Sequence, residues 1–299
     1  MLKYVMAAAA LKGFSMNRAT KHLYRQISNV IGEKGRMAVA DIDIRVDRGD
    51  LLIDLCRKHS AVTAGDSILE IGTGWMHFYS LYLRLFFDLR VTALDIWDNR
   101  QFRALQAAAC KLLSIFESRG MERTSLDTLR QVLSSKDFPD LYEKLGYQYV
   151  IEPTGAISQF RDAEFSFITS FHVLEHVPTQ YVEQLARDMF RKLRPGGYTI
   201  HQIGIDDHLT HYDASASEKQ YLKYSDRQWK LLFENEVQYF NRLQTSDWLR
   251  YFREAGFELR EMISAGTDIS SLSVDARFGG YPREDLECTC LTLVYRKPG

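Results

Sequence analysis

The stretch Ser67–Trp75 (SILEIGTGW), followed by Val91–Ile96 (VTALDI), decides the fold of this 299-residue chain. The letters SILEI predict a short buried strand, and Gly72 and Gly74 at its end let the backbone turn tightly and approach a ligand without a Cβ in the way. A helix expected directly afterwards would point its free N–H groups at that ligand. One strand–helix–strand unit later, Asp95 ends a second apolar strand, where a carboxylate can accept hydrogen bonds from ribose hydroxyls. The pattern therefore predicts a site for a ribose-bearing cofactor.

Two residues of the same stretch indicate which cofactor this is. A dinucleotide fingerprint would read G-x-G-x-x-G, with the third glycine packed beside a pyrophosphate, and here the third position is His77. The carboxylate of Glu70 would repel a pyrophosphate, whereas it suits the cationic amino-acid end of S-adenosylmethionine (SAM). Charge therefore favours SAM over NAD.

Further motifs follow in a recognisable order. After E-x-G-x-G and the acid that ends strand two come Phe165–Pro178 (FSFITSFHVLEHVP) and Leu193–Gly197 (LRPGG). This order resembles that of class I SAM-dependent methyltransferases over roughly residues 60 to 299, and the chain is similar to uncharacterised bacterial members of that superfamily. The resemblance implies an α/β fold: a seven-stranded Rossmann-like sheet of order 3-2-1-4-5-7-6 with strand 7 antiparallel, an N-terminal helical cap and lid insertions.

The resemblance also implies roles for residues at matching positions. The E-x-G-x-G residues should line the methionine and ribose side of SAM, Asp95 should hold the ribose hydroxyls, and Ile96 should pack against adenine. The loop after strand three often offers an acid to adenine, but here it reads Glu152–Ala156 (EPTGA), so Thr154 or the backbone would make that contact. The expected cofactor-binding residues are Glu70, Gly72, Thr73, Gly74, Asp95, Ile96, Thr154, Phe171 and His172.

Spacing along the chain predicts its organisation. We expect a helical cap at residues 1–60 and a methyltransferase domain at 61–299, with an insertion at about 119–147 and a lid at about 205–243. Strands are expected at 67–71, 90–94, 148–151, 165–170, 198–204, 258–263 and 288–296. Helices are expected at 75–87, 101–118, 125–134, 140–145 and 179–193, with one more ending at 254.

Composition limits the partners. A net charge of −1 argues against a general nucleic-acid or anionic-membrane surface, so a small-molecule or glycan acceptor is expected. No segment approaches the roughly 18 uninterrupted apolar residues that a membrane span needs. The four cysteines contain no C-x-x-C pair and are expected to be buried thiols of a cytoplasmic protein. Whether the protein forms a homodimer through the insertion is not decided by the sequence.

His172, Glu175 and His176 form the sequence H-x-x-E-H. On one helix this would be a zinc-protease signature, but here it follows a strand and precedes Pro178, which argues against that assignment. The segment resembles ubiquinone-biosynthesis O-methyltransferases, in which an acid, a Glu and a His at these positions hold a divalent metal; His172 replaces the first acid. A metal is therefore not expected, and local hydrogen bonding is the favoured role.

A second polar concentration follows strand five. Because ligands of α/β sheets bind beyond the carboxyl ends of the strands, these side chains are expected to overlook the transferred methyl group. An imidazole held by a carboxylate suits the removal of a proton from an attacking hydroxyl. We predict His208 as the general base, oriented by Asp206 or Asp207, with His176 and His211 as close competitors and a solvated polar loop as the alternative. The concentration comprises His201, Asp206, Asp207, His208, His211 and Asp213.

The sequence thus predicts transfer of a methyl group from SAM to an acceptor, most simply a hydroxyl oxygen of a small molecule or glycan. The aromatic residues of the lid suit a flat or sugar acceptor, but they are as well suited to packing the lid on the core. An NAD-dependent oxidoreductase and a catalytically silent SAM-binding scaffold are the alternatives. The acceptor, its atom and the metal dependence stay open.

Overall fold

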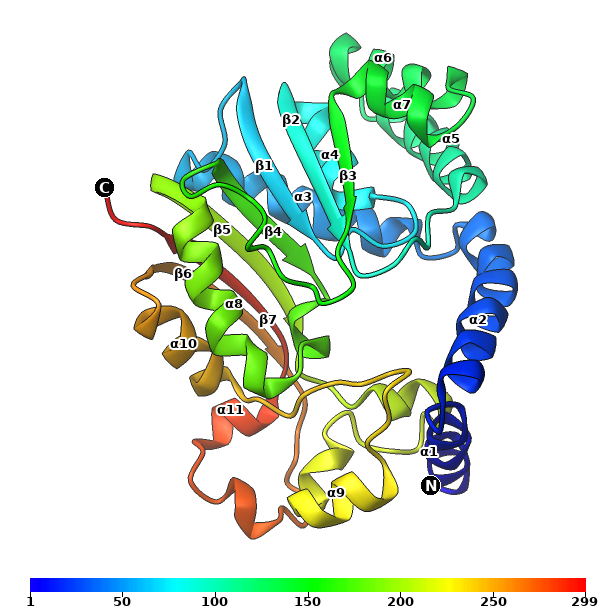
Figure 1. The fold of residues 1–299 in the computed structure, drawn as a ribbon, viewed down its shortest axis with the longest axis vertical. Helices are drawn as coiled ribbons and strands as arrows, with labels where there is room; N and C mark the ends of the chain where they lie inside the picture. Colours follow the sequence, from blue (N-terminus) through cyan, green and yellow to red (C-terminus); the bar gives the residue numbers. More distant parts are fainter. The chain divides into compact units, whose positions relative to one another are not determined.

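The computed structural model describes residues 1–299, and its central feature is a seven-stranded sheet of order β3-β2-β1-β4-β5-β7-β6 with β7 antiparallel (Figure 1). This order is the one predicted. Strand β1 pairs in parallel with β2 and β4, and β2 pairs in parallel with β3. The strands are β1 (Asp66–Ile71), β2 (Leu89–Asp95), β3 (Tyr147–Ile151), β4 (Phe165–Phe171), β5 (Leu193–Gly204), β6 (Glu258–Gly266) and β7 (Cys288–Arg296).

Eleven α-helices surround or extend the sheet. Residues 1–60, expected to be helical, contain three of them. The helices are α1 (Leu2–Phe14), α2 (Arg18–Ala38), α3 (Ile42–His59), α4 (Phe78–Phe86), α5 (Phe102–Ser118), α6 (Arg123–Ser134), α7 (Phe138–Leu145), α8 (Thr179–Lys192), α9 (Asp226–Leu232), α10 (Thr245–Glu254) and α11 (Arg283–Glu287).

Helices α9 and α11 were not predicted, and β6 ends three residues later than expected. Two further differences, at α4 and β5, have a clear cause. Helix α4 begins at Phe78 rather than near Trp75, because His77 takes a left-handed φ of 49°, which a helix cannot continue. Strand β5 begins at Leu193, so the predicted turn at 195–197 lies inside it. Gly196 donates its N–H to the carbonyl of Lys297 at 3.0 Å, and this pairing with the chain end extends the strand.

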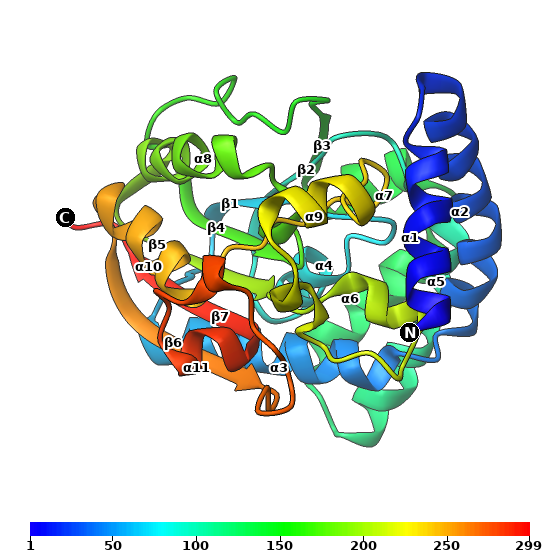
Figure 2. The same ribbon diagram turned by 90° about the horizontal axis from the view of Figure 1, so that it is seen from below.

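The chain divides into two compact units. Unit 1 contains residues 1–27, 172–187 and 201–293, and unit 2 contains residues 28–171, 188–200 and 294–299. In unit 2, the apolar strands and helices α3 to α5 share one hydrophobic core. The insertion extends that core, because α6 packs against α4 and α5, and α7 packs against β3 (Figures 1 and 2).

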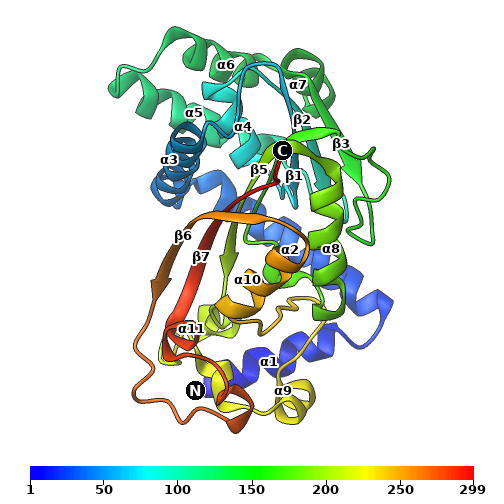
Figure 3. The same cartoon turned by 90° about the vertical axis from the view of Figure 1, so that its left-hand side faces the viewer.

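Unit 1 has its own core, which includes residues of the segment 205–243. The aromatic side chains of Tyr221, Trp229, Phe233 and Phe240 are buried there with Tyr4 of α1. These aromatic residues of the expected lid therefore lie in the core, and Tyr212 is the exposed tyrosine of the segment 205–243. Figure 3 shows β6 and β7 of this unit running side by side.

The cysteines only partly follow the expectation of buried thiols. All four are free thiols; Cys56 and Cys288 are buried and Cys290 is half-buried, but Cys110 is exposed. Burial raises the pKa of the Cys56 thiol far above its usual range. The prediction was wrong for Cys110, because helix α5 presents that position to solvent. None of the helices has the length and apolar character needed to cross a membrane.

Candidate functional site

The loop after β1 has the conformation that its glycines predicted. Gly72 and Gly74 take φ values of 69° and 66°, which residues with a Cβ rarely adopt. A Cβ built on Gly74 would meet no atom within 4 Å, so the backbone at this position faces open space. Gly72 and Thr73 both donate their N–H groups to the carbonyl of Leu94, at 2.8 and 3.1 Å. The loop is thereby fixed to the end of β2.

Asp95 lies at that end of β2 and holds the loop through its side chain. Its two carboxylate oxygens accept hydrogen bonds from the N–H of Gly74 at 2.9 Å and the N–H of Ile96 at 2.8 Å. Burial raises the pKa of Asp95, although these backbone donors lower it in part. The carboxylate is therefore held in one orientation before any ligand binds.

Glu70 lies at the end of β1 with only 2% of its surface exposed. Burial raises its pKa to about 7, against hydrogen bonds from Ser80 and Thr73 that lower it. The carboxylate accepts a hydrogen bond from Thr73 Oγ1 at 2.6 Å. A cationic ligand group nearby would stabilise the charged form of this acid.

The remaining predicted cofactor residues have different surroundings. Ile96 exposes 47% of its side chain, so an apolar surface is free where adenine is expected. Thr154 donates its hydroxyl to Glu152 Oε1 at 2.8 Å, which leaves it a local partner in the turn. The ring of Phe171 stacks on that of Tyr79 with centroids 3.9 Å apart.

These residues fit SAM. The open glycine turn gives access to the backbone, and Asp95 presents a fixed carboxylate for ribose hydroxyls. Glu70 offers an acid for the ammonium group, and the exposed side chain of Ile96 offers an apolar contact. When bound, SAM supplies a methyl group that its sulfonium charge already activates; the chain's task is to bind and orient it.

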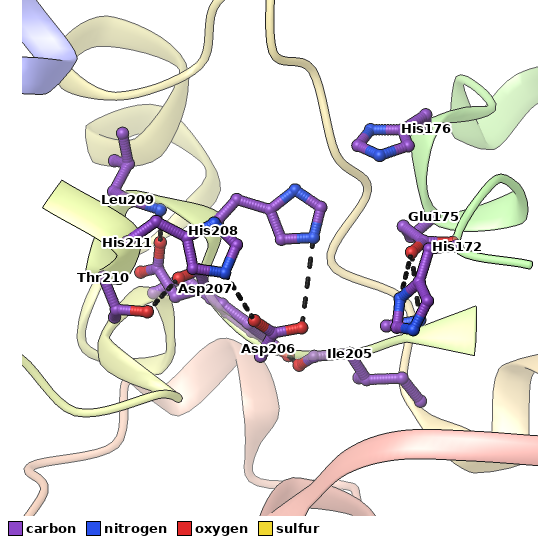
Figure 4. A network of polar contacts seen from close by, with 12 residues as sticks. His172, Glu175, His176, Ile205, Asp206, Asp207, His208, Leu209, Thr210 and His211 are labelled. Atoms are coloured by element: carbon purple, nitrogen blue, oxygen red, sulfur yellow. Dashed lines mark hydrogen bonds and ion pairs between the residues drawn. The ribbon is translucent and has the colours of Figure 1, made fainter. Parts of the chain in front are cut away.

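Unit 1 contains a cluster of four histidines and two acids, built from the loops after β4 and β5 (Figure 4). Glu175 lies at its centre, fully buried, and its Oε1 is 3.2 Å from His172 Nδ1 and 3.1 Å from the N–H of Gly204, which donates to it. A Cβ on Gly204 would lie 2.9 Å from that oxygen. A side chain at this position would therefore displace the Glu175 carboxylate. The cluster comprises His172, Glu175, His176, Asp206, His208 and His211.

Two histidines of the cluster differ in their chemistry. His176 Nδ1 lies 2.6 Å from the carbonyl oxygen of Tyr239, and a carbonyl only accepts, so the neutral ring carries its proton on Nδ1 and keeps the lone pair of Nε2. The ring is exposed, so that lone pair is accessible. His208 lies 5.0 Å from His176, ring centre to ring centre, and burial lowers its pKa to about 3. His208 is therefore neutral at pH 7 but holds an extra proton poorly.

Of the two acids offered as orienting groups, Asp206 is the one beside the histidines. Its carboxylate is 3.9 Å from His208 Nε2 and 3.8 Å from His211 Nε2. Asp207 instead accepts hydrogen bonds from the hydroxyl of Tyr4 at 2.6 Å and the N–H of Leu209 at 3.0 Å. Asp207 thus ties α1 to the lid and caps the short 3-10 helix that follows it.

The other two residues of the concentration lie elsewhere in unit 1. His201 is fully buried beside Phe252, and burial lowers its pKa to about 3. Asp213 forms an ion pair with the amino terminus of Met1 at 2.5 Å, which lowers the pKa of that carboxyl. Neither residue contributes to the cluster.

The cluster has unused ligand atoms. Atoms of Glu175, His176 and His208 that could ligate a metal all lie within 4.8 Å of one another. Glu175 Oε2 and His172 Nε2 are buried without a hydrogen-bond partner. Imidazole and carboxylate groups in this number can hold a divalent cation, and they can equally bind the hydroxyl of an acceptor.

Sequence reasoning missed several residues that organise these sites. Asn241 supports the Glu175 loop, because its side-chain amide donates to the carbonyls of Leu174 and Val177, each at 3.0 Å. Tyr142 of the insertion bonds to His77 at 2.6 Å. His77 was noticed only as the residue that replaces a glycine, and nothing in the spacing pointed to its partner.

Comparison with known proteins agrees with this geometry. The model of the "Methyltransferase domain" family matches residues 32–262. None of the curated protein sequences matches this chain significantly.

Among solved structures, the chain is similar to a SAM-dependent methyltransferase from Methanosarcina mazei (19% identity, TM-score 0.45, 80% of this chain and 96% of that chain). It is also similar to phosphoethanolamine N-methyltransferase 2 of Haemonchus contortus in complex with SAM (12%, 0.46, 84% and 53%). A third similar structure is a SAM-dependent methyltransferase from Mesorhizobium loti, with 15% identity, a TM-score of 0.44, and coverage of 82% of this chain and 96% of that chain.

The family match covers most of the chain, and it agrees with the glycine turn, the acid that ends β2 and the strand order. It also decides against the oxidoreductase alternative. The chain belongs to the methyltransferase-domain family and is a class I SAM-dependent methyltransferase.

Proposed function

We propose that the protein methylates a hydroxyl oxygen of a small molecule or glycan, with a histidine of the unit 1 cluster as general base. The observation that carries the proposal is the bond between His176 Nδ1 and the carbonyl of Tyr239, which leaves Nε2 free to accept a proton. Burial lowers the pKa of His208, the base expected from the sequence, so its neutral ring serves better as a hydrogen-bonding partner for the acceptor. His176 is therefore the first candidate and His208 the second.

The balance of the reaction is simple. The acceptor oxygen attacks the methyl carbon as the bond from carbon to sulfur breaks, the hydroxyl proton passes to His176 Nε2, and S-adenosylhomocysteine (SAH) leaves.

The test is methyl transfer from labelled SAM to a panel of hydroxylated aromatics and sugars. His176→Ala should lower kcat at least about a hundredfold, with the KM for SAM changed less than about twofold. His22→Ala, an exposed histidine of α2, is the matched control and should leave kcat unchanged. If His208→Ala removes activity while His176→Ala keeps it, His208 is the base. Methylation of none of these acceptors, together with SAH binding, would contradict the choice of a hydroxyl acceptor.

A second candidate is a metal-dependent transfer, favoured by the convergence of Glu175, His176 and His208 and by the unpartnered Glu175 Oε2. Here the cation would hold the acceptor oxygen and lower its pKa. Dialysis against a chelator, with activity measured before and after addition of Mg²⁺, Mn²⁺ or Zn²⁺, separates the candidates. Loss and recovery of turnover would support the metal, and unchanged turnover would exclude it.

We also propose that residues 1–60 cap the methyltransferase domain and that residues 205–243 act as a lid. Within unit 1, α1 supports this proposal because Tyr4 bonds to Asp207 and the amino terminus pairs with Asp213. Limited proteolysis with and without SAH tests it. Cleavage between 205 and 243 should slow when SAH binds.

A further inference from the structure

A buried chain of hydrogen bonds runs through unit 2 from the cofactor loop to the inserted helix α7. Thr73 Oγ1 lies 2.6 Å from Glu70 Oε2 and 2.7 Å from His77 Nδ1. On the far side of the imidazole, His77 Nε2 lies 2.6 Å from the hydroxyl oxygen of Tyr142. Glu70, Thr73 and His77 are all buried. These hydrogen bonds therefore link an acid of the cofactor loop to a residue about 70 positions later in the sequence, without solvent between them.

Counting donors and acceptors shows in which direction the hydrogen bonds of this network run. A charged Glu70 only accepts, so Thr73 must donate its single hydroxyl proton to it. The oxygen of Thr73 then accepts from Nδ1–H of His77, which places the lone pair on Nε2. That lone pair accepts the hydroxyl proton of Tyr142. Each group thus donates toward Glu70, and one arrangement satisfies all three bonds.

The far end of the chain is also anchored. Arg100 donates from Nη1 to the hydroxyl oxygen of Tyr142 at 3.4 Å. The same guanidinium forms two bonds with Asp98, at 2.8 and 2.7 Å, and lies 4.3 Å above the ring of Tyr149. Tyr142 is therefore held by a cation that is itself fixed, which favours donation of its proton to His77.

His77 is built into this position by its backbone as well as its ring. It ends the loop at a left-handed φ of 49°, where its backbone precedes α4. Its ring packs against Phe138 and Tyr149, with centroids 5.1 and 5.3 Å away. Burial, together with the charge of Arg100, lowers its pKa to about 3, so the ring is the neutral relay that the bond directions require.

We propose that Thr73, His77 and Tyr142 are positioning residues for the cofactor: their hydrogen bonds hold Glu70 charged and oriented toward the cationic end of SAM, and they make the insertion part of the cofactor site. The inference depends on the SAM assignment and is independent of which histidine acts as base. It explains why a histidine stands where a dinucleotide site has glycine, since here the side chain carries the contact to the insertion.

The proposal makes binding depend on pH through Glu70. Its titratable neighbours are Asp95 on β2, Tyr79 on α4 and Tyr147 on β3, and Thr73 and Ser80 donate hydrogen bonds to it. The ammonium group of SAH binds the carboxylate better than the neutral acid, so affinity should rise between pH 6 and pH 8, around the Glu70 pKa of about 7. The bond from Thr73 lowers that pKa, so its loss should move the midpoint to higher pH.

The test is calorimetric titration of the full chain with SAH at pH 6, 7 and 8. Thr73→Val keeps the shape and removes the hydroxyl, and Tyr142→Phe removes the donor to His77. Each should weaken SAH binding about fivefold at pH 7, the effect of one hydrogen bond. Thr73→Ser restores the hydroxyl and should rescue binding to within about twofold. Tyr149→Phe is the matched control, because its ring contacts His77 but its hydroxyl bonds to the carbonyl of Trp97.

The pH midpoint separates positioning from general support of the fold. If the chain acts on Glu70, Thr73→Val moves the midpoint up and Tyr142→Phe moves it in the same direction by less. Wild-type affinity and an unmoved midpoint in both variants would overturn the inference, as would weaker binding that tracks a fall in Tm with the midpoint unchanged. Failure of the unmodified chain to bind SAH would instead overturn the cofactor assignment.

Discussion

The cofactor loop and the histidine cluster are both groups of polar residues that follow strands, but they differ in how far their hydrogen bonds are satisfied. In the loop, Glu70, Thr73, His77 and Tyr142 are joined by bonds of 2.6 to 2.7 Å. In the cluster, Glu175 Oε2 has no partner, and His208 and His211 lie 3.9 and 3.8 Å from Asp206. The loop is complete before its ligand arrives, whereas the cluster keeps capacity for groups that come with the acceptor.

The difference has a physical cost. A buried polar atom without a partner costs about 1–3 kcal/mol, and a catalytic role or a bound group is one reason for a native structure to keep it. This difference supports the roles that we propose, with the cluster at Glu175 as the reaction site and the loop as the binding site. The predictions below damage one region at a time, so that binding and turnover should separate.

The largest effect is expected from Asp95→Asn. The substitution keeps the shape but turns one acceptor oxygen into a donor, which then faces the N–H of Gly74 or of Ile96. It also removes the charge offered to ribose hydroxyls. The Kd for SAH should rise between about tenfold and a hundredfold, measured by calorimetry at pH 7.5.

The control for this variant is Asp88→Asn, an exposed carboxylate that pairs with Arg84. It should bind SAH as the unmodified chain does. If Asp95→Asn also binds normally, the contact between Asp95 and the loop is structural only, and the ribose assignment loses its support.

Gly204→Ala should give the reverse pattern, with SAH binding kept and turnover lost. The new Cβ would lie 2.9 Å from Glu175 Oε1 and 3.1 Å from both Asp206 Oδ1 and His172 Nδ1, so the cluster must open. We expect kcat to fall at least about tenfold, with the Kd for SAH changed less than about twofold. Gly280→Ala is matched, because its Cβ would meet nothing within 4 Å. Equal loss of binding would show that the two regions are not independent.

The sequence predicted the backbone of the fold more fully than the contacts of its sites. Strand β7 has the predicted bounds, and β1 to β4 differ by one residue at their ends, because buried β runs and glycine turns are local signals. Strands β5 and β6 are longer than predicted. The strand order itself came from the resemblance to methyltransferases. Thus the local sequence pattern and the resemblance to the family together predicted the cofactor loop from Glu70 to Asp95.

The residues that could not be predicted are those whose partners lie far along the chain. Tyr4 bonds to Asp207 across 203 positions, and His77 bonds to Tyr142 across 65. The hydrophobic periodicity of the sequence does not indicate such pairs, since they depend on how the elements pack. Asp206 and Asp207 are adjacent and identical in type, and only the turn between them sends one toward the histidines and the other toward α1.

Asp207 should make stability fall as pH rises. Burial raises its pKa from 3.8 to about 7, so the folded chain binds a proton that the unfolded chain has already released. Its contribution is complete below about pH 4 and is lost as pH rises through 7. Asp207→Asn removes this titration, so the unfolding free energy of the variant relative to the unmodified chain should improve by up to about 2 kcal/mol between pH 5 and pH 8. Urea denaturation at both pH values measures it, and a constant difference would refute the assignment.

Tyr4→Phe is the smallest expected change and tests the same contact from its other side. It removes the hydroxyl that donates to Asp207 Oδ2, and it should cost about 1 kcal/mol of unfolding free energy. Because that bond lowers the pKa of Asp207, the cost should be greater at pH 8, where the carboxylate is charged, than at pH 5. Tyr212→Phe, whose exposed hydroxyl bonds to Gln238, should change stability by less than about 0.5 kcal/mol at either pH. An equal cost at both pH values would mean that Tyr4 stabilises the lid through its buried ring and not through Asp207.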